Sequence, residues 1–296
     1  MASPELRNIV AMLRAIPRRE NPSIASLRRG FESMTRMFPP PADVRVEQVT
    51  LGSITGERLT PNDADPARTV LYLHGGGFVM GSPGTHRDLV ARIARAAGAT
   101  AYVPDYRLAP EHPFPQGIHD CVAVYREVLA LGVSPSRLVI AGDSAGGGLT
   151  MATLLSLRDA GLPLPAAAVC LSPWVDQTIS GASVDTRAES DPWIPKEGLH
   201  QMSRHYLADA DPRHPLASPI LADLSRLPPL LVQVGTAEIL YDDAHRLAER
   251  AREGGVDVTF EPWEEMFHVW QAFPMLPEAH EAVARIARFI REKTAG

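Results

Sequence analysis

Cysteine is scarce in this chain of 296 residues, which has only Cys121 and Cys170. Each lies among apolar residues, and neither forms a Cys-x-x-Cys pair or a metal-ligand cluster with histidine. We interpret both as inert core thiols, although the sequence leaves a disulfide between them open. The N-terminus also lacks an unbroken apolar run suited to a signal peptide, so we expect a cytoplasmic protein.

Basic residues do not predominate, since 29 Lys and Arg stand against 35 Asp and Glu and give a formal net charge of −6. Without a basic patch to attract a phosphate backbone, nucleic acid is excluded as a partner. The chain also lacks internal repeats and low-complexity segments. With 45% hydrophobic residues it can bury a large core, so we expect a single domain over residues 1–296 and a small, neutral ligand.

A serine within a glycine-rich turn is the most informative feature that is present. Residues 138–141 form a short apolar run, which leads into Gly142-Asp143-Ser144-Ala145-Gly146 and then into a helical pattern. This order of strand, turn and helix is typical of a nucleophile elbow. Side chains at positions 142 and 146 would collide across so tight a turn, which explains the glycines. Ser144 is therefore the candidate nucleophile.

A second glycine-rich segment follows another apolar run. Residues 70–73 lead directly into His74-Gly75-Gly76-Gly77-Phe78. Consecutive glycines allow the main chain to approach a ligand and to direct its N–H groups toward a developing oxyanion. The alternatives are a flexible turn or a phosphate cradle, but no Gly-Lys-Ser/Thr follows. The segment predicts an oxyanion loop.

A serine nucleophile needs a base and an acid that follow it along the chain in the order serine, acid, histidine. Among the ten histidines, His268 is best placed, after the strand-like residues 256–260 and before the last helical pattern. Glu238 directly follows an apolar strand pattern and is the candidate acid. Asp242 and Asp243 compete with it, but they begin a helical pattern, where acidic residues favour the helix dipole.

These motifs, together with residues 105–111 and Ser172-Pro173-Trp174, resemble the bacterial hormone-sensitive-lipase family of esterases (family IV) over nearly the whole chain. The resemblance implies an α/β-hydrolase fold, in which a mostly parallel central sheet is flanked by helices and covered by a helical cap. It also implies that residues 105–111 are a scaffold and that His74 orients the glycine loop without transferring protons.

The resemblance further implies that the oxyanion donors are the N–H groups of Gly76, Gly77 and Ala145. Family members usually carry aspartate where this chain has Glu238. That departure is chemically mild, because Ser-His-Glu triads are accepted variants of this arrangement.

The expected cap has two parts. Residues 1–36 mix apolar residues with several arginines and predict one or two amphipathic helices, for which binding to a membrane surface is the competing explanation. The resemblance instead assigns residues 1–43 to a cap, with a second part at about 175–225 that holds a helical stretch over 196–207. Candidate substrate-binding residues are Phe78, Trp174, Met202 and Tyr206, with Trp193 as a further candidate, although each aromatic ring could equally be plain packing.

Alternating strand and helix patterns predict a mostly parallel sheet between layers of helices. Strands are expected near 44–52, 68–73, 99–104, 137–141, 166–171, 229–234 and 256–261, and helices near 117–131, 144–160, 240–254 and 277–293. The last strand alternates apolar with polar residues, which suits a sheet edge, and an exposed edge favours a homodimer formed through residues 256–261.

Together these features predict a serine carboxylesterase that hydrolyses small, short-to-medium acyl esters through a Ser144-His268-Glu238 triad and an acyl-enzyme. No metal or other cofactor and no stable membrane association are expected. An acetyl hydrolase, an amidase or an acyltransferase could use the same site. A ligand receptor on the same fold is the alternative from another class, but such a protein would lack a working base.

Overall fold

The computed structural model describes residues 3–16, 22–35 and 37–295, and its centre is one sheet with the strand order β1-β2-β4-β3-β5-β6-β7-β8. The strands are β1 (Val44–Leu51), β2 (Ile54–Pro61), β3 (Thr69–Leu73), β4 (Thr100–Pro104), β5 (Leu138–Asp143), β6 (Ala167–Leu171), β7 (Leu230–Gly235) and β8 (Val258–Trp263). Only β2 runs antiparallel to its neighbours, β1 and β4. The α/β-hydrolase architecture with a mostly parallel sheet is therefore confirmed.

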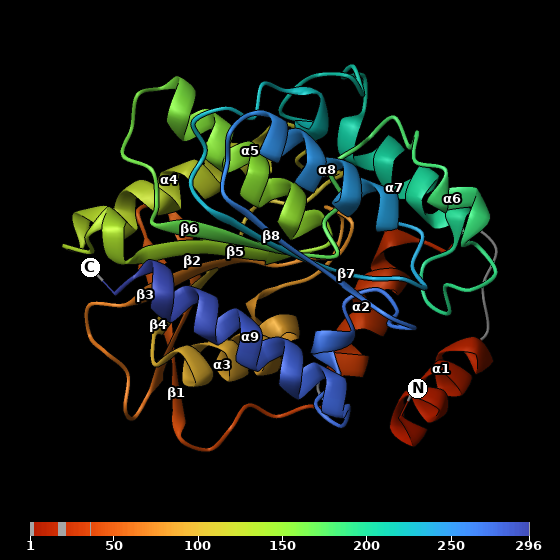
Figure 1. Cartoon of the computed structure of the whole chain (residues 1–296), viewed down its shortest axis with the longest axis horizontal. Helices are drawn as coiled ribbons and strands as arrows, with labels where there is room; N and C mark the ends of the chain where they lie inside the picture. Colours follow the sequence, from red (N-terminus) through yellow and green to blue (C-terminus); the bar gives the residue numbers. More distant parts are fainter. Residues whose placement is uncertain (1–2, 17–21, 36, 296) are drawn as a thin grey trace.

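Helices cover both faces of the sheet (Figure 1). Helices α3 (Pro83–Ala97) and α9 (Pro277–Lys293) cover one face, and α4 (Gln116–Ala130), α5 (Ala145–Asp159) and α8 (Tyr241–Glu253) cover the other. Because β3, β5, β6 and β7 lie between two layers, their side chains are buried and their sequences are mostly apolar. These runs form two large apolar cores, one on each face.

Strand β2 and helix α3 escaped the sequence prediction. Strand β2 has Gly56, Glu57 and Arg58 at its centre, which are residue types that strands usually lack, and the buried Glu57 is held by Arg87. Helix α3 begins with Pro83-Gly84 after a capping box formed by Ser82 and Thr85. Strand β8 also begins and ends two residues later than the predicted range of 256–261.

The N-terminal helices and the helices of the segment around residues 175–225 lie toward the same end of the sheet, at the right of Figure 1. Helices α1 (Pro4–Ala15) and α2 (Ile24–Thr35) confirm the two expected amphipathic helices, while residues 17–21 and 36 of this region lie outside the described part. The second segment holds the short α6 (Ser183–Thr186) and α7 (Lys196–Leu207). Arg14 of α1 donates to the carbonyl of Glu189 at 3.4 Å. The division into a core and a cap over 1–43 and 175–225 stays a prediction.

Strand β8 forms one edge of the sheet, as expected, and β1 forms the other. The homodimer through β8 stays a prediction.

Cys121 and Cys170 are buried free thiols, and burial raises the pKa of Cys170 to about 12. None of the helices in the described residues combines the length and the apolar character that crossing a membrane requires.

Candidate active site

Ser144 occupies the turn between β5, which ends at Asp143, and α5, which begins at Ala145. Its backbone has φ +53° and ψ −121°, a strained conformation for a residue with a side chain. A Cβ atom at position 142 would collide with the carbonyl of Gly146, and one at 146 would collide with the carbonyl of Leu73. The predicted collision across the turn is therefore confirmed for Gly142, whereas Gly146 is required because β3 lies against the turn. The turn has the geometry of a nucleophile elbow.

His268 and Glu238 meet as the sequence predicts. His268 Nδ1 lies 2.6 Å from Glu238 Oε2, and both side chains are buried. Burial opposes protonation of His268, but the hydrogen bond and the negative charge of Glu238 outweigh it and raise the pKa of the imidazole. The carboxylate thus holds the ring through Nδ1 and leaves Nε2 for proton transfer.

Ser144 and His268 line one pocket. Within the described part of the chain, the hydroxyl of Ser144 makes no hydrogen bond to His268. Such bonds are often long before a substrate enters the site and tighten in the reacting complex. The two side chains are therefore brought to one cavity, with Glu238 behind the base.

The predicted oxyanion donors lie beside the nucleophile. Gly76 and Gly77 line the pocket with Ser144 and have φ +119° and +62°. Ala145 is the first residue of α5, where N–H groups have no partner within the helix. Among the described residues, no hydrogen bond uses the N–H groups of Gly76, Gly77 or Ala145. All three are therefore available to an anionic oxygen.

Asp143 links the elbow to the glycine loop. Its Oδ1 accepts hydrogen bonds from the Gly75 N–H at 3.1 Å and the Tyr72 hydroxyl at 2.8 Å, and its Oδ2 lies 3.3 Å from His86 Nε2. Burial alone would raise the pKa of Asp143, but His86 and Tyr72 reverse this effect and lower it. A buried carboxylate thus fixes the distance between the nucleophile strand and the loop.

His74 lies behind the glycine loop, in the supporting place that the resemblance implies. Its Nδ1 lies 2.9 Å from the Gly75 carbonyl oxygen, and the Tyr106 hydroxyl donates to the His74 carbonyl at 2.6 Å. Burial lowers the pKa of His74 to about 3, so the ring is neutral at ordinary pH. A neutral ring of this kind can orient the loop without adding a charge beside it.

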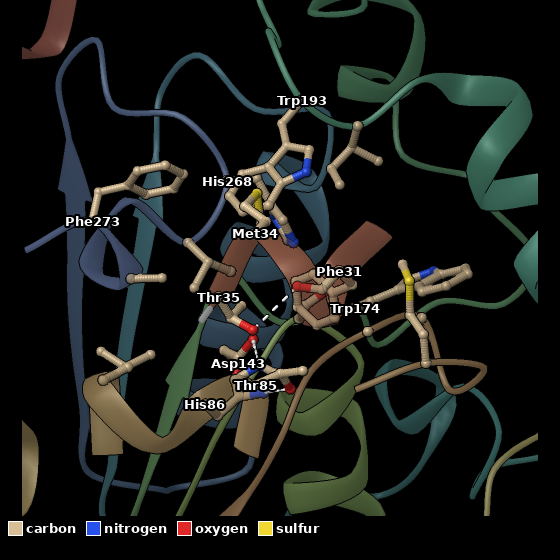
Figure 2. A pocket seen from close by; sticks show the side chains of 18 of the residues that line it. Phe31, Met34, Thr35, Thr85, His86, Asp143, Trp174, Trp193, His268 and Phe273 are labelled. Atoms are coloured by element: carbon tan, nitrogen blue, oxygen red, sulfur yellow. Dashed lines mark hydrogen bonds and ion pairs between the residues drawn. The ribbon is translucent and has the colours of Figure 1, made fainter. Parts of the chain in front are cut away.

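The pocket is lined mainly by apolar side chains, and Figure 2 shows His268 and Trp193 at one end of the view with Thr85, His86 and Asp143 at the other. Its apolar lining residues are Phe31, Met34, Phe38, Met80, Leu89, Trp174, Trp193, Ile194, Leu199, Met202, Leu240, Val269, Ala272 and Phe273. Three of the candidates, Trp174, Met202 and Trp193, are among them.

The other two candidate substrate-binding residues, Phe78 and Tyr206, do not line the pocket. Phe78 and Tyr206 are buried and stack on each other, and neither is among the residues that line the pocket in the described part of the chain. Sequence reasoning also missed the contribution of α2, whose Phe31, Met34 and Thr35 face the pocket. The only available signal was the amphipathic pattern of this segment, which indicates a helix but not what the helix covers.

Asp242 and Asp243, which competed with Glu238, bind backbone instead. Asp243 Oδ2 accepts from the N–H groups of Val175 and Asp176 at 2.9 Å each, and Asp242 Oδ2 accepts from that of Ser183. They attach the segment after β6 to α8.

The described residues contain no cluster of three or more His, Cys, Asp or Glu side chains that could hold a metal ion.

Comparison with known proteins agrees with this fold. The family described as having the alpha/beta hydrolase fold matches residues 70–272. An acetyl-hydrolase from Streptomyces hygroscopicus is 46% identical over 99% of this chain and 98% of its own length. An esterase from Acinetobacter venetianus is 35% identical over 89% of this chain and 88% of its own.

Solved structures give the same result. A crystal structure of an esterase from the bacterial hormone-sensitive lipase family superposes with a TM-score of 0.95 at 47% identity and covers 99% of each chain. An esterase/lipase from an uncultured bacterium superposes with a TM-score of 0.96 at 46% identity over 100% of each chain. The chain belongs to the α/β hydrolase fold family, within the bacterial hormone-sensitive lipase group of esterases. Its class of activity is carboxylic ester hydrolysis.

Proposed function

We propose that this protein is a serine carboxylesterase in which Ser144, His268 and Glu238 form the catalytic triad. The observation that carries the proposal is the 2.6 Å contact between His268 Nδ1 and Glu238 Oε2, beside a pocket that His268 shares with Ser144. A carboxylate in this position selects the tautomer that accepts a proton at Nε2 and stabilises the imidazolium that results. Few structural roles require a buried histidine, a buried carboxylate and a strained serine at one cavity.

The reaction proceeds through an acyl-enzyme. Ser144 Oγ attacks the ester carbonyl carbon as His268 Nε2 takes its proton, and the N–H groups of Gly76, Gly77 and Ala145 stabilise the oxyanion. His268 then protonates the departing alcohol as the carbon–oxygen bond to it breaks. Water, activated by the same imidazole, hydrolyses the acyl-enzyme and regenerates the serine.

The substrate is a small, neutral ester with a short-to-medium acyl chain. The apolar lining of the pocket, with Trp193 and Phe31 in its walls, supports an uncharged acyl group. A narrower function, removal of acetyl groups, is supported by the 46% identical relative named an acetyl-hydrolase. A series of p-nitrophenyl esters from acetate to decanoate distinguishes the two: an acetyl hydrolase loses kcat/KM at butyrate, whereas the broader esterase does not.

A serine-directed phosphonate tests the triad. We expect it to label Ser144, as located by mass spectrometry, and we expect Ser144→Ala to abolish both labelling and ester turnover. Ser136→Ala, at an exposed serine that precedes β5 and so lies at the opposite end of that strand from Ser144, is the matched control and keeps both. Burst release of p-nitrophenol by Ser144→Ala would contradict the proposal. Competition between water and added alcohols in the same assay measures acyl transfer.

The remaining predictions on assembly and location rest on the sequence. Size-exclusion chromatography at several concentrations tests the homodimer through β8, and a charged substitution at Thr259, on the exposed side of that strand, would dissociate it. Cell fractionation tests the cytoplasmic location.

A further inference from the structure

Ser172 follows β6 directly and is fully buried. Its N–H donates to the carbonyl of Gln233 in β7 at 2.7 Å, so its backbone continues the pairing of the two strands. Its φ is +45°, in the left-handed region that residues with a Cβ atom occupy only at a cost. Backbone strain of this kind persists only where the surrounding contacts hold it, and the contacts of the Ser172 side chain are among these.

The hydroxyl of Ser172 bridges the acid and the base of the proposed triad. Its Oγ donates to Glu238 Oε1 at 2.8 Å and accepts from the N–H of Val269 at 3.1 Å. Val269 is the residue after His268 and also has a positive φ, +50°. Glu238 divides its two oxygens accordingly: Oε2 holds His268, while Oε1 accepts from Ser172 and from the N–H of Gly235 at 2.6 Å.

We propose that Ser172 is a positioning residue of the esterase reaction, acting by fixing Glu238 and the backbone at position 269 in one geometry. This inference rests on the proposed triad. Glutamate has three side-chain torsions, so its carboxylate needs external contacts to stay in line with an imidazole. The buried hydroxyl of Ser172 can donate one hydrogen bond and accept the other only when Glu238 and the loop that carries His268 keep one relative position.

Ser183 offers a matched control, because its hydroxyl has the same kind of environment. It is buried, donates to the Ile239 carbonyl at 2.6 Å and accepts from the Asp242 N–H at 3.0 Å. The chain it holds is adjacent to Glu238, yet Ser183 makes no hydrogen bond to the carboxylate of Glu238 or to Val269. Removing either hydroxyl therefore breaks two hydrogen bonds, but only the loss of Ser172 removes a contact from the carboxylate of Glu238.

The experiment compares Ser172→Gly, Ser172→Ala and Ser183→Ala with the wild type in p-nitrophenyl butyrate hydrolysis over a range of pH, with thermal melting as the measure of folding. Glycine suits the positive φ at 172, so this variant removes the hydroxyl without backbone strain. For both Ser172 variants we expect kcat to fall about 10- to 100-fold at a nearly constant KM, the effect of one hydrogen bond to a charged group. The acid limb of kcat/KM should move to lower pH, because a displaced Glu238 no longer raises the pKa of His268.

Ser183→Ala should melt at a lower temperature than the wild type and keep the wild-type kcat and acid limb. The inference is overturned if the Ser172 variants keep both quantities, or if Ser183→Ala loses kcat to the same extent, since general loosening would then explain the effect. Should Ser172→Ala fail to fold, Ser172→Gly decides the outcome. A wild-type protein that phosphonate does not label at Ser144 refutes the proposed triad itself, which is a separate result.

Discussion

The ring of Phe78 lies nearly parallel to the ring of Tyr206, with 3.8 Å between centroids and 11° between planes. Phe78 directly follows the glycine loop, and Tyr206 belongs to α7. The Tyr206 carbonyl also accepts from the N–H of Phe114 at 2.7 Å. Helix α7 is therefore fixed to the loop that carries the proposed oxyanion donors, and the two aromatic residues support the pocket from behind its wall.

Tyr206→Ala should release this contact and let the glycine loop shift. An aromatic pair contributes about 0.5–1.5 kcal/mol beyond its buried area, so we expect kcat to fall about 3- to 10-fold, together with a lower melting temperature. Tyr206→Phe keeps the ring and should keep wild-type kcat. Steady-state kinetics on one ester measure both variants, and equal kcat for alanine and wild type would show that the stack does not position the loop.

The pH dependence of kcat/KM should report the imidazole of His268. Its pKa is raised above the ordinary value of 6.5, because Glu238 outweighs the effect of burial. Protonated His268 cannot accept a proton from Ser144, so activity falls as the pH drops through the raised pKa and is full above it. We therefore expect the midpoint of the acid limb to lie above 6.5.

Glu238→Gln removes the negative charge and should lower that midpoint, while kcat falls about 10³- to 10⁴-fold through loss of the correct tautomer. The control is Glu264→Gln, at an exposed carboxylate in the loop before His268. An acid limb that stays in place in Glu238→Gln would mean that another group titrates.

The sequence could predict most of this site because its parts are local. The elbow around Ser144 and the loop at Gly76 are short motifs in which glycine is required on steric grounds. The meeting of Glu238 with His268 follows from topology, since β7 and β8 are parallel neighbours and their carboxyl ends share one edge of the sheet. A base and an acid that each follow one of these strands are thus brought together.

Other parts depend on tertiary contacts that no local pattern records. The role of Ser172 depends on a hydroxyl pointing at Glu238, 66 residues later in the chain. Helix α2 buries none of its own residues fully, so its apolar stripe does not reveal that Phe31 and Met34 face the pocket. Phe78 and Tyr206 resemble lining residues in the sequence, but their stacking directs both rings into the packing behind the wall.

Gly76→Ala tests the glycine loop directly. Position 76 has φ +119°, and a Cβ atom there would collide with the backbone carbonyl of Met80. The backbone of the loop must then shift, and displacement of one oxyanion donor lowers kcat about 100-fold. Gly161→Ala is the control, because Gly161 has φ +65° with open space around its Cβ position. Backbone strain alone should lower its melting temperature and leave kcat unchanged; a similar loss of kcat in both variants would contradict this account.

Arg28→Ala should loosen the attachment of α2 to the body of the protein. The guanidinium of Arg28 donates to the carbonyls of Val79 at 2.8 Å and Ala109 at 3.0 Å, and it pairs with Glu111 at 2.7 Å. Val79 lies two residues after Gly77, so one side chain joins a helix that lines the pocket to the loop beneath it.

Because these contacts hold the wall of the pocket and not the reacting atoms, their loss should weaken substrate binding more than chemistry. We expect KM for p-nitrophenyl butyrate to rise about 5-fold, the effect of roughly 1 kcal/mol from a partly exposed cluster, with kcat within 2-fold of wild type. Arg29→Ala, at the exposed neighbour on the same helix, should leave KM unchanged. If Arg28→Ala lowered kcat at constant KM, Arg28 would instead act through the oxyanion loop, and α2 would have no separate part in binding the acyl group.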